Sequence, residues 1–190
     1  FLHFSKPWGL DGRVKIDMLT GPLPDSVPRE QIKYTHPRIR PRGALELHAY
    51  LTTEALDFED AMSPLIIDGV GSDGQPASVT VHVPQPFTFI LMKLHAFADR
   101  VEDADADLGR HHALDVYRIV AMLTEREYDD IGRGVLKHDG TTPIMRAREI
   151  VSTHFSKADK LGILRLQEHQ LFDAKMDVSQ LIASLTDLFR

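Results

Sequence analysis

The stretch VHVPQPFTFILMKLHAFADR, residues 81–100, marks the point where the chain changes from strand to helix. Up to residue 84 apolar side chains alternate with polar ones, which is the period of a strand. From Pro86 onward they recur every three or four residues, which is the period of an amphipathic helix. Pro86 suits a first helical position, where its missing N–H costs no hydrogen bond. This stretch therefore predicts a β-rich part over residues 1–85 and a helical part over residues 86–190.

Several segments of the β-rich part have the alternation or the turn residues of strands. They are FLHF (1–4), RVKIDML (13–19), ALELHAYL (44–51) and SPLIIDGVGSDGQPASVTVHVP (63–84), the last being two strands joined by a glycine-rich turn. TTEALDFED (52–60) predicts a single helical turn.

In the helical part, the first helix has an apolar stripe of Phe87, Ile90, Leu91, Leu94, Ala98 and Val101. The acidic connector EDADADLG (102–109) leads to a second helix over residues 110–123, with Leu114, Val116, Ile119, Val120 and Leu123 on its apolar face. Further helices are predicted over about 142–155, 158–172 and 178–189. The fold class is therefore α+β, a mixed or mostly antiparallel sheet followed by packed helices, and we expect the two parts to form one continuous unit.

The composition is that of a globular protein, and its length favours one domain or one domain with a helical extension. No cysteine is present, which excludes disulfides, thiolate metal sites and a thiol nucleophile and fits a reducing, cytoplasmic compartment.

No apolar run is long enough to predict a membrane span. A net charge of −6 argues against a protein coated by nucleic acid. The basic loop RIRPRG (38–43) could contact phosphate or be a solvated connector.

Lys93 lies in the most apolar half of the first helix, where a lysine is unusual. Helical spacing places it on one side with Phe89, Ala96, Phe97 and Arg100, and places His111, Asp115 and Arg118 on one side of the second helix. If the two helices form an antiparallel hairpin, Asp115 can face Lys93. The ammonium could then hold a phosphate and the carboxylate could orient it or help to position a metal. The alternative is a structural ion pair between the helices.

Three other groups of residues are candidates for ligand binding. Asp17 occupies the middle of a predicted strand, where it could be a rigid metal ligand or a solvent-facing carboxylate. The acidic connector lacks the glycine and terminal glutamate of a calcium loop, so we expect a solvated loop in which Asp107 could cap the next helix. His111 and His112 point about 100° apart on a helix, which favours surface or capping roles over one shared ion.

The segments VPQPFTFILMKLHAFADR and LGRHHALDVYRIVAML resemble the helical part of nucleotidyltransferase-fold proteins. The similarity is to the AbiEii-like group, which includes toxins of toxin–antitoxin and phage-defence systems. In that group a K-L-x-A-x-x-x-R helix follows a strand ending in proline, and the next helix has an H-A-x-D-[LV]-Y-like motif. These positions are Lys93, Leu94, Ala96, Arg100, His112, Ala113, Asp115, Val116 and Tyr117. The resemblance covers about residues 13–125.

The resemblance implies a nucleotidyltransferase-like sheet and an enzyme that transfers a nucleoside monophosphate from an NTP to a hydroxyl of RNA, such as tRNA, or of a protein. It implies catalytic roles for Lys93 and Asp115, nucleotide binding by Lys93 and Arg100, and Mg²⁺ binding by Asp17. For a toxin, an antitoxin protein would be a further partner.

One motif of that family has no counterpart in the chain. The family opens with a Gly-Ser or Gly-Gly helix start followed by D-x-D on a strand, which binds the triphosphate and metal ions. Because the chain begins with an apolar strand and without Met, we expect residues upstream of Phe1 to carry this motif. If the motif has been lost, the resemblance implies a non-catalytic module that binds a nucleotide or a partner.

Overall fold

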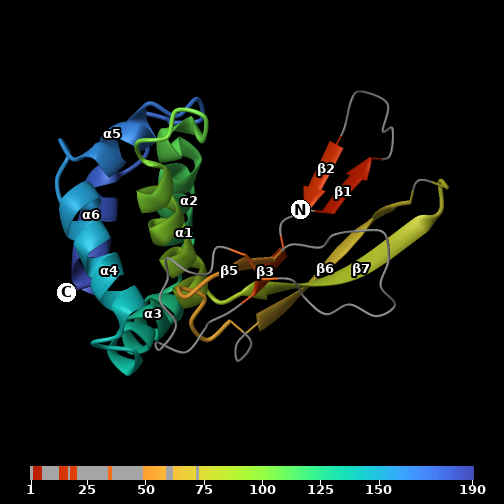
Figure 1. The fold of residues 1–190 in the computed structure, drawn as a ribbon, viewed down its shortest axis with the longest axis horizontal. Coiled ribbons are helices and arrows are strands. Elements are labelled where there is room, and N and C mark those ends of the chain that lie inside the picture. The colour runs from red at the N-terminus through yellow and green to blue at the C-terminus, as the bar shows by residue number, and fades with distance from the viewer. Residues whose placement is uncertain are drawn as a thin grey trace. The chain divides into compact units, whose positions relative to one another are not determined.

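The computed structural model describes residues 2–5, 13–16, 18–20, 34–35, 49–58, 62–71 and 73–190, with side chains from residue 52 onward. The fold is α+β, with strands in the first part of the chain and helices in the rest, as the sequence predicts (Figure 1). The chain divides into two compact units, Phe1–Leu56 and Asp57–Arg190. The predicted boundary at residue 85 instead coincides with the change from strand to helix.

The first unit contains short strands. β1 (Leu2–Ser5) pairs antiparallel with β2 (Arg13–Ile16). β5 (Ala49–Leu51) lies between β3 (Met18–Thr20), to which it is parallel, and β4 (Tyr34–Thr35), to which it is antiparallel. The strands predicted at 1–4, 13–19 and 44–51 are thus present in part. Asp17 and the basic loop 38–43 lie outside the described residues.

The residues that join the two units form no helix. Over 52–58 the backbone makes bends and a turn, so the helical turn predicted for 52–60 is wrong for these residues. Asp57 in this turn has a positive φ of 56°, a conformation that interrupts a right-handed helix.

The second unit begins with the predicted hairpin. β6 (Met62–Val70) and β7 (Pro76–Pro84) pair antiparallel from Met62↔Pro84 to Val70↔Pro76. The turn is closed by Gly71, whose N–H donates to the Gln75 carbonyl at 2.8 Å, and Gly74 adopts a φ of 78°, which glycine tolerates without strain. The apolar side chains of Leu65, Ile66 and Ile67 in β6 all remain about half exposed or more.

Helix α1 (Pro86–Arg100) is the central helix of the core. Pro86 is at its first turn, as predicted, and the stripe residues Phe87, Ile90, Leu91, Leu94 and Val101 are buried, whereas Ala98 is partly exposed. Phe97, one turn after Lys93 on the same helix, is fully buried, whereas the Lys93 side chain keeps 23% exposure. Its ring packs edge-on against Phe155, 4.9 Å away between centroids. A second set of helices covers this side of α1, which the periodicity of one helix does not show.

The remaining helices pack against α1 or against one another. They are the 3-10 turn η2 (Asp107–Gly109), α2 (Arg110–Met122), α3 (Glu125–Lys137), α4 (Thr142–Ile150), its π-helical continuation η3 (Val151–Phe155), α5 (Leu161–Gln167) and α6 (Val178–Leu188). The helices predicted at 110–123, 142–155 and 178–189 are present, and that at 158–172 is shorter than predicted. The sequence did not lead us to expect α3, although Thr124 and Glu127 form a capping box at its start.

Two details of α2 differ from the sequence-based prediction. Its N-cap is Gly109, with no side-chain cap, so Asp107 does not cap it. Ala113, Leu114 and Val116 are buried, whereas Ile119, Val120 and Leu123 are partly exposed, because only the first half of the helix packs closely.

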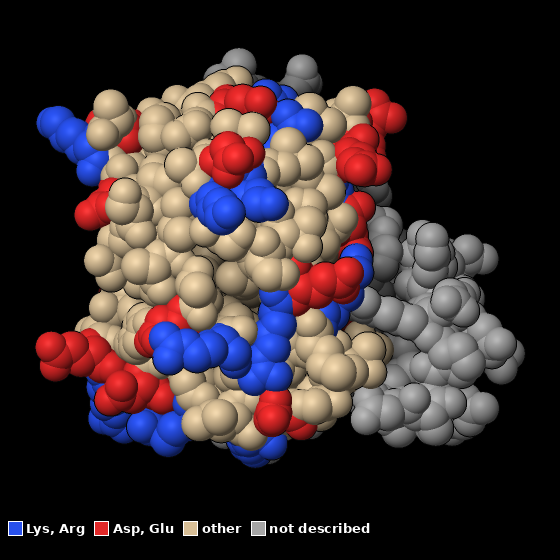
Figure 2. Space-filling model, turned by 90° about the vertical axis from the view of Figure 1, so that its left-hand side faces the viewer, with Lys and Arg blue, Asp and Glu red and all other residues tan. Residues whose placement is uncertain are grey.

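On the side of the molecule that carries α4, α5 and α6, acidic and basic side chains lie next to one another (Figure 2). Ion pairs between residues three apart occur in or at the ends of these helices, namely Arg146–Glu149, Arg165–Glu168 and Asp187–Arg190. Among the described residues, no helix combines the length and the apolar character that a membrane crossing requires.

Candidate functional site

The connector between α1 and α2 brings the two helices side by side. Asp107, Leu108 and Gly109 have positive φ values of 59°, 53° and 73°, which turn the chain back sharply. A Cβ at Gly109 would lie 3.0 Å from the Phe97 ring, so a glycine also permits the close approach of the connector to α1. The two helices therefore form the hairpin that the sequence required for Asp115 to face Lys93.

Lys93 and Asp115 form an ion pair between these helices. Lys93 Nζ donates to Asp115 Oδ2 at 2.6 Å. The side chains keep 23% and 32% of their exposure, so both remain within reach of a solute. Nζ also lies 5.2 Å from the centre of the Phe89 ring, which gives the ammonium a cation–π contact on one side. The predicted pairing of Lys93 with Asp115 is confirmed.

His112 lies close enough to this pair for the charges of Lys93 and Asp115 to act on its pKa. Burial above all, and then the positive charges of Arg100 and Lys93, lower the pKa of His112 to about 4, against the opposing effect of Asp115. Its Nδ1 atom is buried and has no hydrogen-bond partner among the described residues. His112 is therefore neutral near pH 7 and retains an unused hydrogen-bonding nitrogen next to two cations.

Arg100 provides a second positive charge near His112. It is the last residue of α1 and is exposed. Its Nη1 donates to the Ala96 carbonyl at 3.5 Å, a long bond, and it makes no ion pair with any carboxylate of the described residues. The guanidinium is thus available to an anion from solution.

The structure therefore brings together Lys93, Arg100 and Asp115, and adds His112 to them. Sequence reasoning had placed His112 at the helix surface or in a cap. The signal that could have identified it is its spacing, because residue 112 lies three positions before Asp115 and therefore on the same face of α2. Asp17, the predicted metal ligand, lies outside the described residues.

The described residues do not by themselves form a metal site. Within the part of the chain that the structure describes, no group of three or more His, Asp or Glu residues could hold a metal ion. Asp115 already neutralises Lys93, which leaves it poorly suited to bind Mg²⁺ alone. His111 turns toward His169 rather than toward His112, with 2.7 Å between the ring nitrogens.

One groove among the helices lies apart from the ion pair. A groove of about 670 Å³ between α2, α3 and α6 is lined by residues such as Tyr117, Tyr128 and Gln180, and includes neither Lys93 nor Asp115. The candidate site is a partly exposed ion pair of the α1–α2 hairpin.

Comparison with known proteins finds no match for this chain among protein families, curated proteins or solved structures.

Proposed function

We propose that this protein is a nucleotidyltransferase-like enzyme that transfers a nucleoside monophosphate from an NTP to a hydroxyl of RNA, such as tRNA, or of a protein. The observation that supports the proposal is the partly exposed Lys93–Asp115 pair with neutral His112 and unpaired Arg100 beside it. The K-L-x-A-x-x-x-R and H-A-x-D patterns place these four residue types in the order found in AbiEii-like toxins, and an antitoxin protein is a proposed partner.

Lys93 is suited to hold a phosphate of the nucleotide. An ammonium has three N–H donors, and one of those of Lys93 is directed at Asp115, which leaves the others for phosphate oxygens. Asp115 and the Phe89 ring restrict the position of Nζ before a ligand arrives, so less conformational entropy is lost on binding. Arg100 would add a second charge to the same anion.

The proposed reaction breaks one bond and forms one. The acceptor hydroxyl oxygen attacks the α-phosphorus of the NTP, the bond to the bridging oxygen breaks, and pyrophosphate leaves. The hydroxyl proton passes to a carboxylate, for which Asp115 is the candidate among the described residues. Mg²⁺, with Asp17 as its proposed ligand, would neutralise phosphate charge when bound.

A second candidate function is a non-catalytic module that binds a nucleotide or a partner protein. The observation that favours it is the lack of a group of metal-ligating carboxylates among the described residues, together with the missing D-x-D strand motif. Such a module would bind an NTP through Lys93 and Arg100 without releasing pyrophosphate.

As the acceptor, a tRNA end or a small acceptor is as suitable as a long RNA. The chain has a net charge of −6. On the face shown in Figure 2 acidic side chains accompany the basic ones, and such a mixed surface gives little of the phosphate neutralisation on which RNA affinity depends.

The first test measures nucleotide binding by the whole chain, using a fluorescent ATP analogue. Lys93→Ala and Arg100→Gln should each weaken binding, Lys93→Ala by about tenfold or more, because a charged hydrogen bond to phosphate is worth about 1.5–3 kcal/mol. Arg126→Gln is the matched control, because Arg126 is also a helix arginine and its side chain is 90% exposed. Unchanged affinity in Lys93→Ala would contradict the proposed site.

The second test separates the enzyme from the binding module and from a purely structural ion pair. The chain is incubated with labelled NTPs, Mg²⁺ and either tRNA or protein acceptors, and label transfer and pyrophosphate release are followed. Transfer that Asp115→Asn abolishes supports the enzyme, and binding without pyrophosphate release supports the module. If Lys93→Met/Asp115→Leu keeps the stability and also the nucleotide affinity, the pair is structural only.

A further inference from the structure

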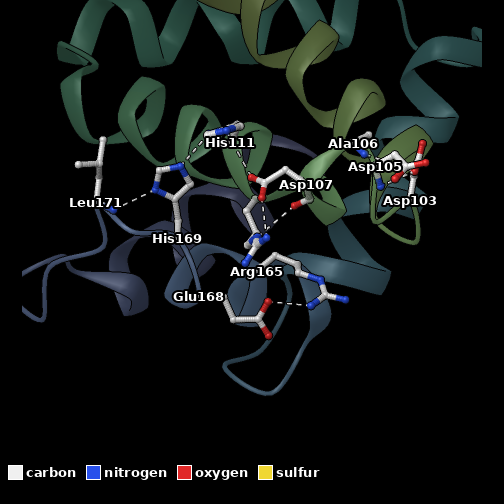
Figure 3. A network of polar contacts seen from close by, with 10 residues as sticks. Asp103, Asp105, Ala106, Asp107, His111, Arg165, Glu168, His169 and Leu171 are labelled. Atoms are coloured by element: carbon white, nitrogen blue, oxygen red, sulfur yellow. Dashed lines mark hydrogen bonds and ion pairs between the residues drawn. The ribbon is translucent and has the colours of Figure 1, made fainter.

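A chain of polar contacts joins the segment after α5 to the start of α2 (Figure 3). The backbone N–H of Leu171 donates to His169 Nδ1 at 3.0 Å. The other nitrogen of His169, Nε2, lies 2.7 Å from His111 Nδ1. On the far side of the His111 ring, Nε2 lies 3.4 Å from Asp107 Oδ2. His169 is 8% exposed, whereas the His111 side chain is 72% exposed.

The backbone determines which nitrogen of each ring carries the proton. Because His169 Nδ1 accepts from the Leu171 N–H, it has no proton of its own, and the proton of the neutral ring is on Nε2. His169 Nε2 therefore donates to His111 Nδ1. The proton of neutral His111 is then on Nε2, facing the Asp107 carboxylate. Every link is satisfied when both rings are neutral.

A single added proton must break one of these links. If it binds His169 Nδ1, the new N–H points at the Leu171 N–H. If it binds His111 Nδ1, that N–H points at His169 Nε2–H, unless His169 moves its own proton to Nδ1, which again opposes the Leu171 N–H. No placement of the extra proton keeps all the contacts, so protonation and the closed arrangement exclude one another.

The surroundings of His169 also favour its neutral form. Burial lowers the pKa of His169, and the positive charges of His111, Arg118 and Arg110 lower it further, while Asp107 opposes them. Arg110 Nη2 is 2.6 Å from Asp107 Oδ1 and so takes up part of that carboxylate's charge. On α5, Arg165 and Glu168 are paired with each other at 2.7 Å.

We propose that His111, His169 and the Leu171 N–H form a histidine latch, which holds the α5–α6 segment against the first turn of α2 when both rings are neutral and releases it on acidification. His169 has an ordinary pKa of about 6.5 in the unfolded chain. The pKa of His169 in the folded protein is lower than this. The latch is therefore fully closed above pH 6.5 and opens as the pH falls through the lowered pKa. The latch stands on its own geometry and does not depend on the proposed enzymatic function.

The test uses the whole chain labelled with ¹⁵N. At pH 7.5 long-range ¹H–¹⁵N spectra should show His169 and His111 both protonated at Nε2. On titration to pH 5 the hydrogen-exchange protection factor of the Leu171 amide should fall by about tenfold or more, in step with the protonation of His169. A His169 protonated at Nδ1 at pH 7.5, or Leu171 protection that does not change with pH, would overturn the proposal.

Two substitutions at His169 separate the two links. In His169→Asn the amide oxygen can replace Nδ1 as the acceptor, so Leu171 should stay protected at both pH values. In His169→Gln the amide can reach toward His111 but not Leu171, so protection should be low at both. His82→Asn, at an exposed histidine of β7, should titrate Leu171 like the unchanged protein. Zinc that shifts both ring signals at micromolar concentration would show a metal site instead and contradict the latch.

Discussion

His112 illustrates how the surroundings of one residue determine its charge. It lies among Lys93, Arg100 and Asp115, and burial is the largest cause of its pKa of about 4. Hydration of a protonated ring is lost on burial, and two neighbouring cations oppose the added charge further. Because His112 is neutral and Asp115 neutralises Lys93, the charge of Arg100 leaves these four residues net positive, which suits an anionic ligand.

The pKa of His112 predicts an acid-sensitive contribution to stability. The unfolded chain binds a proton at His112 below pH 6.5, whereas the folded protein does so only near pH 4, so folding is weakened as the pH falls between these values. In His112→Gln the loss of unfolding free energy between pH 7 and pH 4.5 should be smaller by about 1–2 kcal/mol, allowing for solvent screening. Urea titrations at the two pH values measure this difference.

Comparing His112→Gln with the unchanged protein cancels the contributions to pH-dependent stability that come from other groups. Asp57 has a lowered pKa, despite the opposing effect of burial, because it pairs with Lys137 and His138. It therefore also loses stabilising contacts in acid, equally in both proteins. An identical pH dependence with and without His112 would contradict the assigned pKa.

At the scale of elements, α3 begins with a local hydrogen-bond pattern. Thr124 Oγ1 accepts from the Glu127 N–H at 3.3 Å, and Glu127 Oε2 accepts from the Thr124 N–H at 2.9 Å. The acceptor role also lowers the pKa of Glu127. A T-x-x-E pattern is a known sequence signature of a helix start, so the start of α3 was predictable from the sequence although it was not predicted.

Removing this cap should destabilise the protein. Thr124→Ala loses the side-chain acceptor for the Glu127 N–H, and we expect a cost of about 1 kcal/mol in the free energy of unfolding. Thr142→Ala is the control, because Thr142 is exposed at the start of α4 and is not its N-cap residue. Equal effects of the two substitutions in urea unfolding would argue against the capping box.

Two glycines of α3 provide a test of its packing on α1. A Cβ at Gly134 would lie 2.6 Å from the Phe87 ring, whereas a Cβ at Gly132 would meet nothing within 4 Å. Gly132→Ala should stabilise the protein by about 0.5–1 kcal/mol through helix propensity. Gly134→Ala should instead destabilise it by about 1–3 kcal/mol, because the two helices must move apart.

The prediction is that Gly132→Ala and Gly134→Ala change the free energy of unfolding in opposite directions. Both substitutions add one methyl group to the same helix, so propensity alone would make their effects equal. Thermal unfolding followed by circular dichroism measures both. Stabilisation by Gly134→Ala would show that α3 does not approach Phe87 closely.

At the scale of the whole molecule, one aromatic cluster joins helices distant in the sequence. Phe155 in η3 is fully buried, and its ring lies 4.9 Å from that of Phe97 in α1. On the other side, a Cβ at Gly162 of α5 would lie 2.7 Å from the Phe155 ring. The ring therefore fills the space where three helical segments meet.

Truncation of this ring should be among the costlier single changes in the core. Phe155→Ala should lower the free energy of unfolding by about 3–5 kcal/mol, and Phe155→Leu, which keeps most of the volume, by about 1–2 kcal/mol. Leu164→Ala on α5, where the side chain is 39% exposed, should cost less than either. Chemical denaturation would contradict this if Leu164→Ala proved the more damaging.

The sequence alone predicts where strands change to helices, the starts of α1 and α2, the β6–β7 hairpin, and the sides of the two helices on which Lys93 and Asp115 lie. These features depend on period, proline placement and spacing along one element, which are local properties. Packing between helices determined that Phe97 is buried, that Lys93 and Asp115 meet, and that His169 meets His111, 58 residues away. Such contacts depend on how separate helices pack, and no single helix carries that information in its own period.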